Sequence, residues 1–183
     1  MLISQNSLQL KELEFYILLA IAVSDYGVYR GTYKQLLKYL GLSATNKNIE
    51  LVDLAVESLK NNGYLHEVIK DKTTFTLILK DEAERNFEIT IEMLKESKKI
   101  IEKNNKPIKY LPRLVQVWAA IKICSEEQPF TYAKIEKLTG LSYYQIRELK
   151  KLLESSDIFL TSRAGNRFHC LGMNVDLNAF YNK

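Results

Sequence analysis

The stretch that decides the fold of this chain occurs twice, as Thr32–Ser43 (TYKQLLKYLGLS) and as Thr131–Ser142 (TYAKIEKLTGLS). The second copy follows the first by 99 positions without a gap, and six of the twelve residues are identical. Amino-acid usage alone would give about one identity over this length. The chain is therefore interpreted as one small structural unit used twice.

Apolar residues extend the repeat on both sides. Upstream, Phe15, Leu18, Leu19 and Ala22 align with Leu114, Val117, Trp118 and Ile121. Downstream, after a difference of five residues, Val52, Ala55, Leu59 and Leu65 align with Ile146, Leu149, Leu153 and Phe159. Each unit is expected to hold a first helix, a short helix, a glycine turn and a third helix, which is the plan of a nucleic-acid reader.

Local signals set the expected elements of the first unit. Thr32 and Gln35 have the spacing of a capping box, and Gly41 can take the left-handed conformation that ends a helix. The expected helices are Leu10–Ser24, one starting at Thr32, and Lys47–Asn61. Branched and aromatic residues predict strands at Tyr64–Ile69 and Thr73–Leu79, with a hairpin tip at 70–72.

The second unit is expected to follow the same plan. Ser142 and Gln145 again have capping-box spacing, which sets the start of the third helix at Tyr143. The expected helices are Leu111–Ser125, Thr131–Thr139 and Tyr143–Ser155. Strands are expected at Ile158–Ser162 and Arg167–Leu171, and a last helical turn or a tail at Asn174–Lys183.

Between the units, acids at the start and lysines at the end of Asp81–Asn104 indicate one long connecting helix. The predicted fold is mainly α with small β-hairpins, an α+β chain of two winged-helix domains in tandem. The expected domains are residues 1–80 and 110–183, joined by the connecting segment 81–109.

Composition and charge narrow the classes of protein. The longest apolar run, Tyr16–Val23, is too short to cross a bilayer, and its flank is unlike a signal peptide. Two cysteines, Cys124 and Cys170, form no C-x-x-C pair, which favours reduced thiols in the cytoplasm. The net charge is +4, of which residues 110–183 contribute +3 from ten Lys/Arg and seven Asp/Glu. Any electrostatic contact with nucleic acid must therefore be local.

The sequence around Gly41-Leu42-Ser43 and Gly140-Leu141-Ser142 resembles the helix-turn-helix of bacterial winged-helix DNA-binding proteins. The residues that carry the resemblance are Thr32, Leu36, Leu59, Gly63, Tyr64 and Leu65 in the first copy, and Thr131, Ile135, Leu153, Ile158 and Phe159 in the second. Asp157 stands in the second copy where the first has Gly63. The resemblance implies that the third helix enters the major groove and that the hairpin, or wing, contacts the backbone or minor groove. The alternative is a winged helix that binds another protein.

The two third helices differ in charge. In the first unit, Glu50, Asp53 and Glu57 form an acidic ridge that would repel phosphate, so only the preceding residues, with Asn46 and Lys47, suit DNA. In the second unit, Arg147 is expected to contact a guanine edge, and Lys150 and Lys151 are expected near phosphates. The other candidate DNA-binding residues are Tyr143 and Tyr144 on the third helix, Arg163 and Arg167 at the wing, and Lys134 in the short helix.

A homodimer is also expected. In the connecting helix, Ile89, Met93 and Ile100 lie off the stripe that includes Phe87 and would face water unless a second copy covered them. The residues predicted for self-association are Phe87, Ile89, Met93 and Ile100. The alternative is that both stripes pack within one chain.

Motifs for catalysis and cofactors are missing from the sequence. It has no Gly-rich phosphate loop, nucleophile elbow or metal-ligand helix pair, so neither an enzyme, a metal site, a cofactor nor a small-molecule ligand is expected. The expected function is double-stranded DNA binding, as a transcriptional regulator. A replication initiator of the plasmid or phage type and a protein–protein adaptor built from winged helices are the alternatives.

Overall fold

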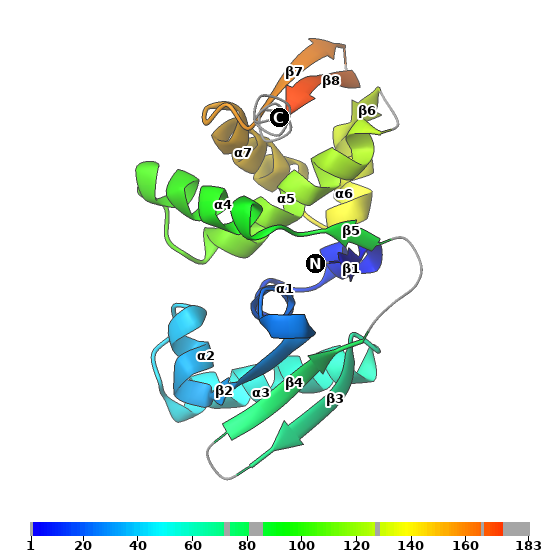
Figure 1. Ribbon diagram of the computed structural model, residues 1–183. Helices are drawn as coiled ribbons and strands as arrows, with labels where there is room; N and C mark the ends of the chain where they lie inside the picture. The colour runs from blue at the N-terminus through cyan, green and yellow to red at the C-terminus, as the bar shows by residue number, and fades with distance from the viewer. Residues whose placement is uncertain (1, 72–73, 81–85, 127–128, 166, 174–183) are drawn as a thin grey trace, which may run out of the picture. The chain divides into compact units, whose positions relative to one another are not determined.

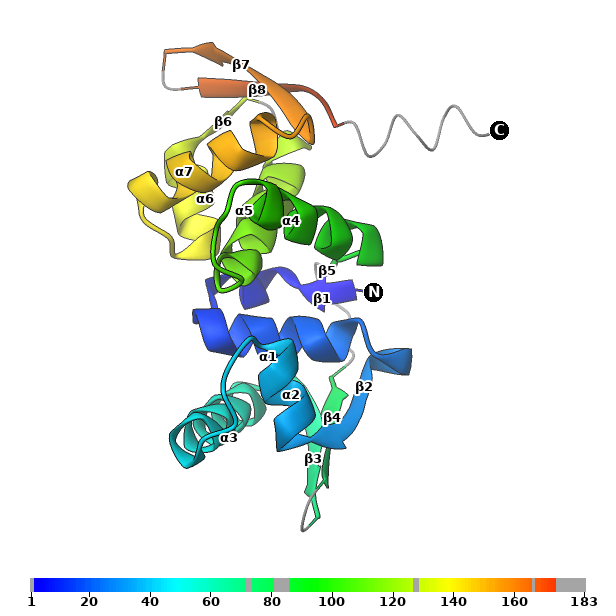
Figure 2. The ribbon, with the colours of Figure 1, turned by 90° about the vertical axis from the view of Figure 1, so that its left-hand side faces the viewer.

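The computed structural model describes residues 2–71, 74–80, 86–126, 129–165 and 167–173. The chain is an α+β protein that divides into two compact units, Met1–Leu94 and Lys95–Lys183. In the described residues it contains seven α-helices and two three-stranded antiparallel sheets, together with one two-stranded pair (Figures 1 and 2).

The core of the first unit is formed by α1 and by the helices and the sheet that pack around it. Its elements are β1 (Leu2–Ser4), the 3-10 helix η1 (Gln5–Gln9), α1 (Glu12–Ala22), the 3-10 helix η2 (Asp25–Gly27), β2 (Val28–Thr32), α2 (Tyr33–Tyr39), α3 (Asn46–Asn61), β3 (Leu65–Lys70), β4 (Thr74–Leu79) and β5 (Asn86–Glu88). Nine of the eleven residues of α1 are buried, because it packs against α3 and the sheet.

The ends of α2 and α3 follow from local chemistry, as predicted. The Thr32 hydroxyl accepts from the Gln35 backbone N–H, and the Gln35 side chain accepts from the Thr32 N–H at 2.8 Å. Gly41 follows α2 with φ +68°, where a side chain would be strained. Thr45 caps α3 one residue earlier than the sequence predicted. These contacts fix the turn between α2 and α3.

The sheet of the first unit has the order β2-β4-β3, with the predicted hairpin β3–β4. Strand β2 lies mostly in Asp25–Gly31, which the sequence predicts to be a loop because it contains two glycines and no clear alternation of apolar and polar residues. It pairs with β4 from Val28↔Ile78 to Thr32↔Thr74 and ends at the α2 cap. The sheet therefore connects the start of α2 to the hairpin.

The second unit repeats this order of elements. Helix α4 (Ile91–Lys103) spans the boundary between the units, and the remaining elements are α5 (Tyr110–Ser125), β6 (Phe130–Thr131), α6 (Tyr132–Thr139), α7 (Tyr143–Glu154), β7 (Phe159–Ala164) and β8 (Arg167–Met173). The sheet order β6-β8-β7 corresponds to β2-β4-β3. Gly140 has φ +66° between α6 and α7, and Ser142 with Gln145 forms the predicted capping box.

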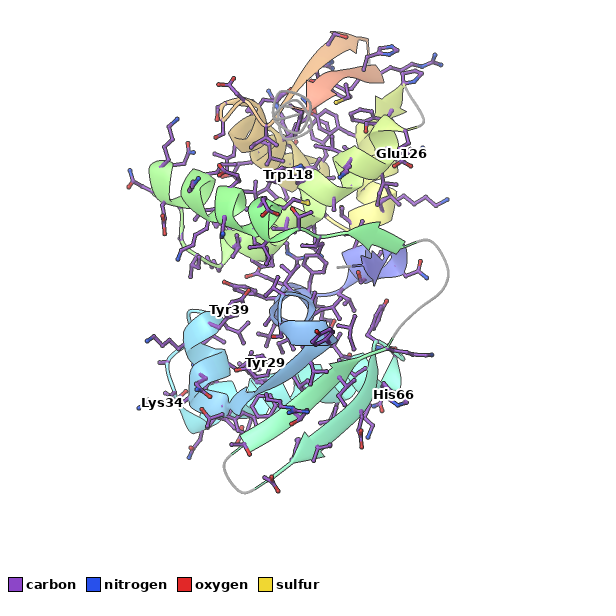
Figure 3. All side chains as sticks on the ribbon, viewed as in Figure 1. Tyr29, Lys34, Tyr39, His66, Trp118 and Glu126 are labelled. Carbon is purple, nitrogen blue, oxygen red and sulfur yellow. The ribbon has the colours of Figure 1, made fainter. Side chains whose placement is uncertain are left out.

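Aromatic side chains hold the second unit together. Trp118 on α5 is 2% exposed and lies among the side chains around α5 (Figure 3). Phe130, Phe159 and Phe168 bring the three strands of the sheet into the same core, each at 3% exposure or less. The sheet therefore covers the helices with its apolar face.

The prediction of one helix over Asp81–Asn104 is confirmed for Ile91–Lys103, which form α4, and is wrong for the described residues before them. Residues 86–88 form β5, which pairs antiparallel with β1, and α4 begins only at Ile91. The Thr90 hydroxyl accepts from the Met93 N–H at 3.1 Å and caps the first turn of α4. The strand forms because pairing with Leu2–Ser4, far away in sequence, satisfies its backbone.

The premise of the predicted self-association site is also wrong. Ile89, Met93 and Ile100 are 2–3% exposed in a single chain, so they do not face water and need no second copy to cover them. The side chain of Phe87 and the prediction for Asn174–Lys183 lie outside what the structure describes. The alternative in which both stripes pack within one chain agrees with this burial.

Candidate nucleic-acid interface

One ridge of α7 presents its polar side chains to solvent. Tyr144, Arg147 and Lys151 are spaced three and four residues apart, so they lie on one face of the helix, and all three are exposed. Tyr144 is 78% exposed. The buried residues Ile146, Leu149 and Leu153 fix the opposite face. We call Tyr144, Arg147 and Lys151 the α7 ridge.

The two carboxylates of α7 are both neutralised by neighbouring lysines. Glu148 forms an ion pair with Lys106 at 2.6 Å, and this hydrogen bond raises the pKa of Lys106. Glu154 pairs with Lys150 at the same distance. Neither Arg147 nor Lys151 forms an ion pair with a carboxylate that the structure describes. With respect to the residues that the structure describes, α7 therefore has two unpaired positive charges, and both of its carboxylates are paired.

Lys150 does not belong to this surface, and its predicted phosphate contact is corrected. It is 4% exposed, and its Nζ donates to Glu154 Oε1 at 2.6 Å and to Thr161 Oγ1 of β7 at 2.9 Å. The ammonium also lies over the Phe168 ring, 4.8 Å from its centroid. In the repeat alignment, Lys150 takes the position of the buried Val56, which is the signal that could have revealed its burial.

Lys150 instead attaches the β7–β8 hairpin to α7. Thr161 donates to the same Glu154 carboxylate that accepts from Lys150, so three side chains form a closed network between the helix and the strand. The hairpin then holds Arg163 and Arg167, which are both exposed. This network attaches strand β7 of the hairpin to α7.

Arg163 has a defined orientation at the hairpin. Its Nε donates to the Gly165 carbonyl at 2.7 Å, and its guanidinium lies 5.7 Å from the centroid of Phe168. The hydrogen bond occupies Nε, so the two terminal nitrogens remain suited to a phosphate. Gly165 has φ +62° at the turn, as a tight hairpin requires.

The pKa of the Tyr132 phenol is affected by charged groups of both α7 and the hairpin. Burial raises the pKa of the Tyr132 phenol, Tyr143 and Glu154 raise it further, and Arg147 and Arg163 both oppose the rise. The Tyr132 ring packs against Tyr143 of α7 and against Phe168 of β8, over which the Arg163 guanidinium lies. Helix α7 and the hairpin therefore meet at Tyr132, and both present exposed basic side chains.

The remaining predicted residues have other positions. Tyr143 is half-buried and packs edge-on against Tyr132 at 4.8 Å, so it supports the surface from behind, whereas Tyr144 points outward. Lys134 is half-buried in the first turn of α6, where its backbone N–H donates to the Thr131 cap. Asn46 and Lys47 are exposed in the first turn of α3 in the first unit.

The corresponding surface of the first unit has the opposite character. In the repeat alignment Asp53 takes the place of Arg147, Glu57 that of Lys151, and Leu54 that of Glu148. Tyr33 donates a short hydrogen bond to Asp53, which also accepts from Lys70 of β3 at 2.6 Å. Partial burial alone would raise the pKa of the Asp53 carboxyl, but the hydrogen bonds from Lys70 and Tyr33 outweigh it and lower that pKa.

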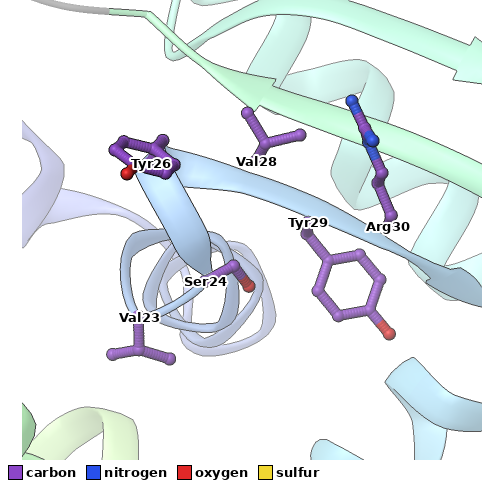
Figure 4. A pocket seen from close by; sticks show the side chains of 6 residues that line it. All are labelled: Val23, Ser24, Tyr26, Val28, Tyr29 and Arg30. Atoms are coloured by element: carbon purple, nitrogen blue, oxygen red, sulfur yellow. The ribbon is translucent and has the colours of Figure 1, made fainter.

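A pocket of about 520 Å³ also opens in the first unit between the end of α1 and β2 (Figure 4). Its lining combines one guanidinium, that of Arg30, with Val23, Ser24, Tyr26, Val28 and Tyr29. Tyr26 is fully exposed and has φ +54°, a left-handed conformation that is uncommon for a tyrosine. Among the described lining residues, one charge and an exposed aromatic rim do not select a ligand class.

The described part of the chain contains no cluster of three or more metal-ligating side chains. Among the helices of the described residues, none is long and apolar enough to cross a membrane. A comparison with protein-family models gives no match, and a comparison with curated protein sequences gives no significant match.

Proposed function

We propose that the two units are winged-helix domains and that the protein binds double-stranded DNA as a transcriptional regulator in the cytoplasm. The order helix, strand, helix, helix, strand, strand in both units supports the winged helix, as do the left-handed glycines before α3 and α7. In this proposal α7 is the recognition helix and the β7–β8 hairpin is the wing.

The observation that carries the proposal is the joint placement of free positive charge on α7 and on the hairpin. Arg147 and Lys151 remain unpaired by described carboxylates after Lys106 and Lys150 neutralise Glu148 and Glu154. Arg163 and Arg167 add two further charges on the hairpin. A helix that fits the major groove and a strand pair that follows the backbone would use these charges for a guanine edge and for phosphates.

Binding of the full chain to a pool of random DNA duplexes at two salt concentrations tests the proposal. We expect binding that weakens with salt as if a few phosphates were contacted, and enrichment of one short sequence after repeated selection. The variant Arg147→Ala should bind the enriched sequence more weakly and lose the preference at one of its base positions, and Lys38→Ala, an exposed lysine on α2, is the matched control.

The same experiment tests the adaptor alternative against both DNA-binding functions. A replication initiator would bind DNA through the same surface, so it shares these outcomes. An adaptor that binds only proteins would show neither salt-dependent binding nor enrichment. Absence of both in the wild-type protein would contradict the proposed function.

A further inference from the structure

Two leucines lie on the solvent face of α3, where a recognition helix would meet DNA. Leu51 is 43% exposed and Leu54 is 63% exposed. They are three residues apart, so they are neighbours on one face, whereas α7 has the polar residues Gln145 and Glu148 at these positions. Exposed apolar side chains grouped on a helix mark an interaction surface.

Charged residues surround this pair in a particular order. Lys47, Leu51 and Leu54 follow one another at spacings of four and three, so the lysine lies in line with the leucines on the N-terminal side. Glu57 is three residues beyond Leu54 and flanks it on the C-terminal side. Both Lys47 and Glu57 are exposed, and neither pairs with a residue that the structure describes. One end of the surface is thus positive and the other negative.

We propose that this surface, Lys47, Leu51, Leu54 and Glu57 of α3, binds the same surface of a second copy of the chain in an antiparallel helix pair. A two-fold axis through the midpoint between Leu51 and Leu54 sets Leu51 against the partner's Leu54. Lys47 lies five and a half residues before this midpoint and Glu57 four and a half residues after it. Lys47 therefore comes within about 1.5 Å, along the helix axis, of the level of the partner's Glu57.

The charge pattern favours a second copy over other occupants. The axis brings each Lys47 to the level of the partner's Glu57, so two pairs of opposite charge face one another across the interface. DNA would meet Glu50 and Glu57, which repel phosphate. An amphipathic helix of another protein could also cover the leucines. A second copy of α3, however, already carries the complementary charges at the matching positions.

Sedimentation equilibrium of the full chain over a range of micromolar concentrations tests this proposal, which does not depend on DNA binding. The wild-type protein should sediment as a dimer in equilibrium with the 21.2 kDa monomer. The double variant Leu51→Ser with Leu54→Ser should weaken dimerisation by about tenfold or more. Both leucines are outside the buried core, and circular dichroism would confirm that the variant is folded.

A charge swap identifies the partner surface. Lys47→Glu alone and Glu57→Lys alone should each weaken the dimer, whereas the two changes together in one chain should restore it, because the ion pairs form again with reversed sign. Ile69→Ser on β3, where Ile69 is 46% exposed, is the matched apolar control and should leave the dimer unchanged.

Three results would overturn the proposal. The first is a single 21.2 kDa species at every concentration. The second is a dimer that the leucine variant leaves intact, which would place the interface elsewhere. The third is failure of the double charge swap to restore association, which would mean that the helices do not pair antiparallel about this axis.

Discussion

The helices α3 and α7 occupy the same place in two units of the same construction, yet they present opposite surfaces. Equivalent positions hold Asp53 and Arg147, and again Glu57 and Lys151. The aromatic pairs beneath these helices correspond in the two units. The ring centroids of Tyr33 and Phe75 are 4.7 Å apart, and those of Tyr132 and Phe168 are also 4.7 Å apart. The comparison teaches that the buried residues set the unit, while a few exposed positions determine what each unit can bind.

The link between the third helix and the hairpin differs in the same way. In the first unit, an acid on the helix meets a base on the strand, and the side chains of Asp53 and Lys70 are 33% and 43% exposed. In the second unit, the base is on the helix, and the Lys150 side chain is only 5% exposed. Burial makes the second link costly to break, and exposure makes the first link weak.

The largest expected effect tests whether the shared scaffold is equally important in both units. Phe75→Ala and Phe168→Ala should each lower the free energy of unfolding of their own unit by about 3–5 kcal/mol, because each removes a buried ring at 3% exposure. Hydrogen exchange measured by mass spectrometry would follow the two units separately in one chain. Equal loss of protection in both units from either variant would show that they do not unfold independently.

The next effect concerns DNA affinity. Arg147→Ala should weaken binding to the selected sequence by about 1–3 kcal/mol and relax specificity at one base position. The cause is loss of the bidentate contact that the exposed guanidinium is proposed to make. Competition binding with single-base variants of the site measures both quantities. An equal loss for Lys38→Ala of the first unit would break the asymmetry between the units.

A smaller effect separates two adjacent lysines. Lys151→Ala should weaken binding to all DNA sequences equally. It should also reduce the salt dependence of binding by an amount that corresponds to about one phosphate contact. Lys150→Met should leave the number of phosphate contacts unchanged and lower the stability of the second unit, because its ammonium is buried on Glu154 and Thr161. Salt titrations of both variants measure this difference. A weaker salt dependence of binding for the Lys150 variant would indicate that Lys150 contacts DNA after all.

The smallest effect is the pH dependence of the first unit. The pKa of Asp53 is lower in the folded chain than in the unfolded one, so its stabilisation is present above the ordinary aspartate pKa and is lost as the pH falls through the folded value. The contribution should be no more than about 1 kcal/mol, because the ion pair is partly exposed. Urea unfolding at pH 7 and near pH 3 should differ less in Asp53→Asn than in wild type. An unchanged difference would mean that other carboxylates cause it.

Sequence reasoning succeeded where the signal was local. The capping boxes at Thr32 and Ser142 and the left-handed glycines at 41 and 140 depend on residues within a few positions, and the helices start and end there within a residue or two. It failed where the partner is distant. Strand β5 forms by pairing with β1, and the acids and lysines of 81–104 gave no sign of that pairing.

The candidate surface was predicted in part for the same reason. Arg147, Lys151 and Tyr144 are exposed as helix periodicity required. The burial of Lys150 depends on Thr161 and Phe168 of the hairpin, whose docking no helix pattern contains. Lys106, which neutralises Glu148 from 42 positions away, gave no sequence signal.

Because Lys150 is buried and Lys151 is exposed, the relative rates at which the two amines are labelled can measure local opening of the second unit. An acylating reagent should modify the exposed Lys151 amine at once, and it can reach Lys150 only when the hairpin separates from α7. Both amines belong to one stretch of chain, so Lys151 calibrates the reagent in every sample. The rate of labelling at Lys150 would then report how often this unit opens, in the free protein or in a mixture with any ligand.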